Sequence, residues 1–185
     1  DAKRDKLMSE FSIIRTSARL NEVDAKLGKT PLKFYTEFLK KNVFDNIKYR
    51  SSSEDFIGRF YGEFMSYSGG DGQTLGIVLT PRHICDLFCD LLDIQATDIV
   101  LDPCCGTAGF LVAAMHHMLE KVGADQNKRK NIKKKQLHGF ELQSNMFAIA
   151  ATNMILRDDG NSNIKCEDFL RQNPAQVQLK GATVG

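Results

Sequence analysis

Apolar residues recur at helical spacing through the first third of the chain. Between residues 3 and 67 they stand three or four positions apart, as on one face of an amphipathic helix. Thr30 followed by Pro31 is typical of a helix start, because Thr caps the first turn and Pro fits the first helical position. The pattern predicts a helical domain over residues 1–70, which ends in the glycine-rich stretch 68–72.

From residue 71 onward, short apolar runs alternate with helical stretches. The predicted elements are, in chain order, a strand at 98–102, a helix at 109–121, a strand at 136–141, a helix at 144–156 and a strand at 163–166. Strands that alternate with helices in this way form a parallel sheet. We therefore expect residues 71–185 to form an α/β domain with a doubly wound sheet.

A basic segment, GADQNKRKNIKKK at residues 123–135, lies between the first of these helices and the second strand. It is rich in turn-forming and charged residues, so we predict a solvated loop. A contact with nucleic-acid phosphates is the alternative, because clustered lysines attract a polyanion.

The composition narrows the class of protein only slightly. The 185 residues carry a net charge of +2, with 42% hydrophobic and 26% charged residues, as in ordinary soluble proteins. No apolar run approaches the roughly 20 residues of a membrane span, and no secretion signal is present. We expect a cytoplasmic protein without a membrane partner, in which the five cysteines are reduced thiols and no metal is bound.

The stretch DPCCGTAGF at residues 102–110 joins the first predicted strand of the sheet to the next helix. It lacks the GxGxxG pattern of dinucleotide sites and the GxxxxGK[ST] pattern of phosphate loops. Asp102 instead places a carboxylate at the strand end, while Gly106 and Gly109 let a ligand approach the backbone. This combination favours a ligand that carries a positive charge.

Two further acids follow predicted strands, Glu141 after the second and Asp168 after the third. The carboxyl ends of neighbouring parallel strands line the ligand crevice of a doubly wound sheet, so three acids would share one groove. An acid after the second strand is the usual acceptor for ribose hydroxyls, and Phe169 offers an aromatic face to a base. Each acid alone could instead cap a helix or face solvent, and Phe169 could pack in the core.

A Thr-Pro-Arg element at residues 80–82 stands before the first predicted strand and the DPCCGTAGF turn. Together these two motifs closely resemble the methyltransferase subunit of type I restriction-modification systems, a family of adenine-N6-specific DNA methyltransferases in which the turn reads DPxCGTGGF. The motifs GFE at 139–141 and EDF at 167–169 extend the similarity, as does the helical first part of the chain. Ala108 stands where the family usually has glycine.

The resemblance implies a Rossmann-like fold that binds S-adenosylmethionine. Thr80 and Pro81 would then flank the cofactor, and the turn would meet its methionine end. Glu141 would hold the ribose, Asp168 the adenine amine and Phe169 the adenine face. The cofactor-binding residues that it implies are Thr80, Pro81, Asp102, Gly106, Thr107, Gly109, Glu141, Asp168 and Phe169.

The catalytic motif of this family, Asn-Pro-Pro followed by an aromatic residue, does not occur in the sequence. The last residues, GATVG, resemble the start of a buried strand, so we expect a fragment that is inactive alone. The resemblance implies methyl transfer to adenine in double-stranded DNA, with a specificity subunit and a restriction subunit as partners. The alternatives are a noncatalytic assembly module and a methyltransferase that acts on RNA or protein.

Overall fold

The computed structural model describes residues 12–46, 58–60, 79–157 and 163–173. The chain divides into two compact units, residues 1–51 and 52–185. The domain boundary that the sequence predicts at residue 70 lies outside the described residues, so it stays a prediction.

The described part of the first unit is helical, as predicted. It contains α2 (Ser12–Thr16), α3 (Ala18–Asn21), α4 (Pro31–Asn42) and the 3-10 helix η1 (Phe44–Asn46). The Thr30 hydroxyl accepts a hydrogen bond from the Lys33 N–H at 3.3 Å, and Pro31 opens α4. The helix start predicted from these two residues is therefore confirmed.

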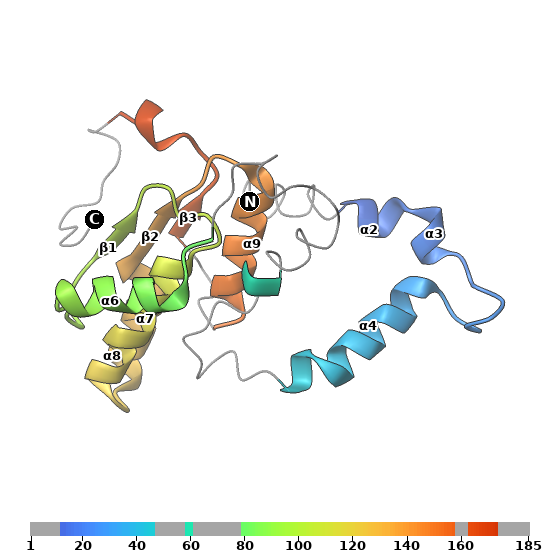
Figure 1. Cartoon of the computed structure of the whole chain (residues 1–185), viewed down its shortest axis with the longest axis horizontal. Coiled ribbons are helices and arrows are strands. Elements are labelled where there is room, and N and C mark those ends of the chain that lie inside the picture. Colours follow the sequence, from blue (N-terminus) through green and yellow to red (C-terminus); the bar gives the residue numbers. More distant parts are fainter. Residues whose placement is uncertain (1–11, 47–57, 61–78, 158–162, 174–185) are drawn as a thin grey trace. The chain divides into compact units, whose positions relative to one another are not determined.

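The second unit is built on a small parallel sheet. Its strands β1 (Val100–Asp102), β2 (Leu137–Phe140) and β3 (Asn163–Lys165) lie side by side in the order β1-β2-β3 (Figure 1). Asp102 pairs with Gly139, and Gly139 pairs with Ile164, so the three strands end at one edge of the sheet. All three predicted strands are confirmed, each slightly shorter than its apolar run.

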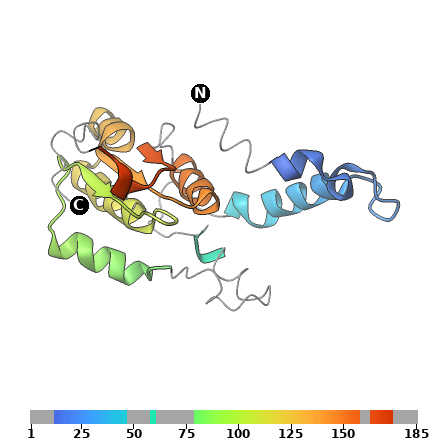
Figure 2. The ribbon, with the colours of Figure 1, turned by 90° about the horizontal axis from the view of Figure 1, so that it is seen from above.

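Helices connect and cover these strands. Between β1 and β2 lies α7 (Gly109–Val122), and between β2 and β3 lies α9 (Ser144–Ile155), while α6 (Arg82–Leu91) precedes the sheet and packs on α7. Figure 2 shows α6 outside the layer that the sheet forms. The two connecting helices bury broad apolar faces, because α7 packs against β1 and β2 and α9 packs against β3. Their buried apolar residues include Leu111, Val112, Met115, Met118, Met146, Phe147, Ala150 and Met154.

Residues 126–135 of the basic segment are helical, so the prediction of a loop is wrong, although most of these residues are exposed as predicted. The segment forms α8 (Gln126–Asn131) and the π-helix η2 (Ile132–Gln136). The Asp125 carboxylate caps α8 by accepting hydrogen bonds from two backbone N–H groups, and Ile132 is fully buried. The buried Gln136 amide donates to the backbone carbonyls of Ala96 and Asp98 at 3.0 and 2.7 Å. The buried Ile132 side chain and the hydrogen bonds of Gln136 thus hold this lysine-rich segment against the rest of the unit.

Neither a membrane-spanning helix nor a cluster of metal ligands occurs among the described residues. Within these ranges, no helix is long and apolar enough to cross a membrane. No group of three potential metal ligands occurs among them either. All five cysteines are free thiols, and Cys85, Cys89 and Cys105 are buried.

Gly139 gives a first testable prediction, because the sheet leaves no room for a side chain there. An added Cβ would lie 3.0 Å from Cys105 Sγ and 3.0 Å from Leu111 Cδ1. We expect Gly139→Ala to lower the free energy of unfolding by about 1–3 kcal/mol, measured by urea denaturation. The double variant Gly139→Ala, Cys105→Ala should recover part of that loss, whereas equal stability of wild type and Gly139→Ala would contradict this packing.

Candidate functional site

The turn between β1 and α7 is held from two sides. Within it, the Cys104 N–H donates to Asp102 Oδ1 at 3.1 Å, which closes the chain around the end of β1. From the neighbouring strand, the Phe140 carbonyl accepts a hydrogen bond from the Cys105 N–H at 2.8 Å. The turn is therefore fixed to the carboxyl ends of both strands.

Glu141 connects this turn to the start of α9. Its Oε2 accepts a hydrogen bond from the Gly106 N–H at 2.9 Å, and its Oε1 accepts one from the Gln143 N–H at 2.7 Å. Gly106 has a φ of +53°, a left-handed conformation that glycine adopts without steric cost. A carboxylate has about four acceptor positions. Glu141 can thus hold the turn and still accept hydrogen bonds from a ligand.

A cavity of about 150 Å³ lies against the turn. It is lined by Leu79, Thr80, Asp102, Cys104, Cys105, Gly106, Thr107, Gly109, Phe110 and Met146. Five residues that the resemblance implies are therefore brought together here, while Pro81 lies beside Thr80 as the N-cap of α6. Met146, on α9, is a lining residue that the sequence offered no signal for, because its pattern is that of any buried helical position.

The charge of the site favours a cationic ligand, as the sequence predicts. Burial, together with the nearby Glu141 carboxylate, raises the pKa of Asp102 even though the Cys104 N–H acts in the opposite direction. Among the described residues, no Lys, Arg or His side chain forms an ion pair with Asp102 or Glu141. A ligand cation beside Asp102 would relieve the cost of its burial.

Asp168 and Phe169 follow β3 and do not line the cavity. Asp168 Oδ1 accepts a hydrogen bond from the Leu170 N–H at 3.0 Å, which caps the 3-10 helix η3 (Phe169–Arg171), and its Oδ2 lies 3.3 Å from Arg171 Nε. The half-buried Phe169 ring meets the Phe140 ring edge-on, with centroids 5.1 Å apart. The capping and packing roles weighed as alternatives are therefore present, and the ligand roles of both residues stay predictions.

Residues 107 and 108 of the turn also contact the protein interior. Ala108 has a φ of +69° and is fully buried, so its methyl group does not line the cavity. The left-handed conformation gives a physical reason for the glycine that is usual at this position. The carbonyl of Thr107 accepts a hydrogen bond from the buried Asn153 amide of α9 at 2.8 Å, a support that the sequence did not reveal.

The parallel sheet, the acidic strand ends and the glycine turn together define a Rossmann-like methyltransferase domain. Residues 52–182 match the family described as N-6 DNA Methylase. The chain belongs to this family, and the resemblance seen in its motifs is confirmed.

Curated relatives and solved structures agree with this assignment. Over 163 residues, the chain is 46% identical to the type II restriction enzyme and methyltransferase RM.BcgI of Heyndrickxia coagulans, covering 88% of this chain and 25% of that protein. Over 154 residues, it is 28% identical to the type I restriction enzyme MjaIX methylase subunit of Methanocaldococcus jannaschii, covering 81% of this chain and 26% of that protein. The chain thus spans about a quarter of the length of these relatives.

Two solved structures share the fold. A type I restriction-enzyme modification subunit from Vibrio vulnificus YJ016 is 29% identical, with a TM-score of 0.54, over 65% of this chain and 25% of that one. A chain from a study of the assembly of a type I restriction-modification system has a TM-score of 0.57 over 93% of this chain and 38% of that one. Its 21% identity supports the fold alone.

Proposed function

We propose that this chain forms the S-adenosylmethionine-binding part of a methyltransferase that modifies the N6 amine of adenine in DNA. The observation that carries the proposal is the hydrogen bond from Gly106 to Glu141, which joins the glycine turn to the acid at the end of β2. Membership of the N-6 DNA methylase family supports the reaction.

The residues of the cavity fit this cofactor. Asp102, with its raised pKa and no cationic partner among the described side chains, would bind the amino group of the methionine end. Glu141 does not line the cavity itself but holds Gly106 of the turn, and it would accept hydrogen bonds from the ribose hydroxyls. Thr80, which lines the cavity, would also contact the ligand. When bound, S-adenosylmethionine supplies the methyl group, carried on a positively charged sulfur.

The adenine end of the cofactor would lie toward β3 in this proposal. Phe169, which is half-buried, would offer its ring face, and Asp168 would accept a hydrogen bond from the adenine amine. Asp168 already caps η3, so its second role uses acceptor positions that the cap leaves open. No residue of the chain is assigned to activate the target adenine, because the sequence contains no Asn-Pro-Pro-aromatic motif.

The whole enzyme could have its methyltransferase and restriction activities on separate subunits or on one protein. The type I methylase relatives support a subunit that acts on double-stranded DNA together with specificity and restriction subunits. The 46% identity to RM.BcgI, which is named as both a restriction enzyme and a methyltransferase, favours one protein with both activities. The mass of the native gene product and of its co-purifying subunits distinguishes the two.

Isothermal titration calorimetry tests the cofactor assignment directly. We expect the folded chain to bind S-adenosylmethionine but not ATP, which shares the adenosine and replaces the cationic end with phosphates that Asp102 and Glu141 would repel. Failure of S-adenosylmethionine to bind the folded chain, or equal binding of ATP, would refute the proposed site.

A further inference from the structure

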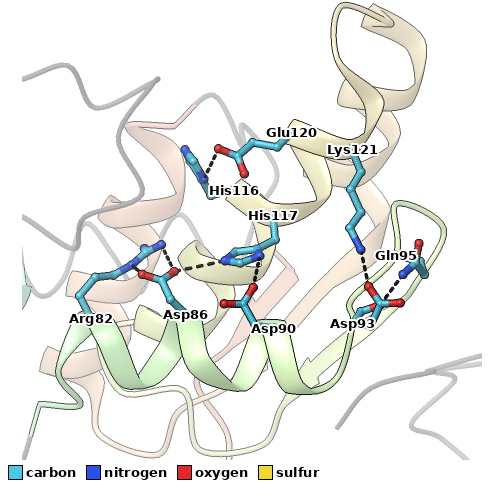
Figure 3. A network of polar contacts seen from close by, with 9 residues as sticks. All are labelled: Arg82, Asp86, Asp90, Asp93, Gln95, His116, His117, Glu120 and Lys121. Atoms are coloured by element: carbon cyan, nitrogen blue, oxygen red, sulfur yellow. Dashed lines mark hydrogen bonds and ion pairs between the residues drawn. The ribbon is translucent and has the colours of Figure 1, made fainter.

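A polar cluster joins α6 to α7 (Figure 3), and none of its residues lines the cavity. We call it the α6–α7 clamp; it consists of Arg82, Asp86 and Asp90 on α6 and His117 on α7. Both Arg82 Nε, at 2.7 Å, and the Arg82 Nη2 donate to the Asp86 carboxylate. His117 Nε2 lies 3.3 Å from Asp86 Oδ1, and His117 Nδ1 lies 3.6 Å from Asp90 Oδ1.

The clamp lies between two helices that both begin close to the cavity. Thr80 lines the cavity two residues before α6 begins, and Gly109, the first residue of α7, lines it as well. A shift of α6 along α7 would therefore change the width of the cavity. The Phe88 and Phe110 rings meet edge-on with centroids 5.6 Å apart, so the two helices also touch near the Phe110 wall of the cavity.

Apolar packing also holds the two helices together. Cys85 and Cys89 are buried on the inner face of α6, but such contacts are non-directional. The clamp adds contacts with defined geometry, since a bidentate guanidinium–carboxylate pair is directional. Chiefly through the hydrogen bond from Arg82, and also through His117, the pKa of Asp86 is lowered despite its partial burial.

Two neighbouring charged pairs do not link α7 to α6 as the clamp does. His116 Nδ1 lies 3.4 Å from Glu120 Oε1 on the same helix, so this pair does not link α6 to α7. Lys121 pairs with Asp93 at 2.8 Å beyond the far end of α6, and the Asp93 side chain is 82% exposed. Among the ion pairs of the described residues, those of His117 alone join α7 to side chains within α6, namely Asp86 and Asp90.

We propose that His117 is a positioning residue for cofactor binding. Through Asp86 and Arg82 it fixes the first turn of α6, and with it Thr80, at the wall of the cavity. This inference rests on the proposed function, because the ligand whose affinity it sets is S-adenosylmethionine.

Four variants of the chain test this role by titration with S-adenosylmethionine. His117→Ala should weaken binding about threefold to tenfold, the size expected for a partly buried charged network. His117→Gln, whose amide takes the place of Nε2, should bind nearly as wild type does. The amide of His117→Asn reaches only the position of Nδ1, so this variant loses the contact with Asp86 and should bind as weakly as His117→Ala. His116→Ala is the matched control and should change the affinity less than twofold.

Hydrogen exchange tests, without any ligand, whether His117 holds the first turn of α6 in place. In the first turn of α6, the N–H groups of Ile84 and Cys85 donate to the Pro81 carbonyl. We expect His117→Ala and His117→Asn to speed exchange of these two amides, while amides of β2 keep their protection and so report an intact sheet. His117→Gln and His116→Ala should leave all of them unchanged.

The outcomes separate this inference from the proposed function. If wild type binds S-adenosylmethionine and His117→Ala matches it in both affinity and exchange, the positioning role is wrong and the cofactor site stands. If wild type does not bind, the proposed function fails. In that case faster exchange of Ile84 and Cys85 in His117→Ala would still support the clamp, and unchanged exchange would overturn it.

Discussion

Glu141→Ala will weaken binding of S-adenosylmethionine by about hundredfold or more. Two hydrogen bonds from the ribose to a carboxylate contribute on the order of 1.5–3 kcal/mol each, and both would be lost. The variant also removes the acceptor for the Gly106 and Gln143 N–H groups, which loosens the turn. Titration calorimetry of both proteins, with circular dichroism to confirm folding, measures the effect.

Glu167→Ala is the matched control for this prediction. Glu167 is an exposed acid next to Asp168, so its removal makes the same change in net charge without touching the turn. It should bind the cofactor as wild type does. Glu141→Gln, which keeps one acceptor oxygen, should fall between wild type and Glu141→Ala. Equal affinities of Glu141→Ala and Glu167→Ala would show that Glu141 does not hold the ligand.

Asp102→Asn will stabilise the ligand-free protein and weaken cofactor binding at the same time. The pKa of Asp102 is raised by burial and by Glu141, so folding favours its protonated form. That contribution to stability is present below the unfolded pKa and is lost as the pH rises through the folded pKa. Above its folded pKa the ionised carboxylate therefore lowers the stability, and a neutral amide, which can still accept from the Cys104 N–H, should raise the melting temperature.

Asp102→Asn should also remove the charged partner of the cofactor's amino group. We expect affinity for S-adenosylmethionine to fall roughly tenfold to hundredfold, as for the loss of one hydrogen bond to a charged group. Wild-type affinity should also fall as the pH drops through the raised pKa of Asp102, whereas the affinity of Asp102→Asn should vary less there. Glu167→Gln serves as the charge-matched control. A ligand-free Asp102→Asn protein that melts below wild type would contradict the electrostatic argument.

The features that the sequence predicts well are those set by neighbouring residues. The mainly apolar runs that end at Asp102 and near Phe140 form strands, as expected for strands that are buried in a parallel sheet. The Thr30 cap depends on an N–H only three residues away. The turn at residues 102–110 combines an acid with glycines in one short stretch, so its position between a strand and a helix could be predicted.

The features that the sequence misses depend on partners far along the chain. The basic segment was predicted as a loop because its lysines dominate its composition, while Ile132 and Gln136 are anchored by residues outside it. Likewise, nothing in the sequence pairs His117 with Asp86, 31 residues away.

The hydrogen bond between Gly106 and Glu141 has a consequence for the order of folding. It joins residues 35 positions apart, so it can form only after β2 has docked beside β1 and a long loop has closed. Helices such as α7 can begin to form earlier, because their contacts are local. Affinity for the cofactor should therefore arise in the last steps of folding, and ligand binding would report that the sheet is complete.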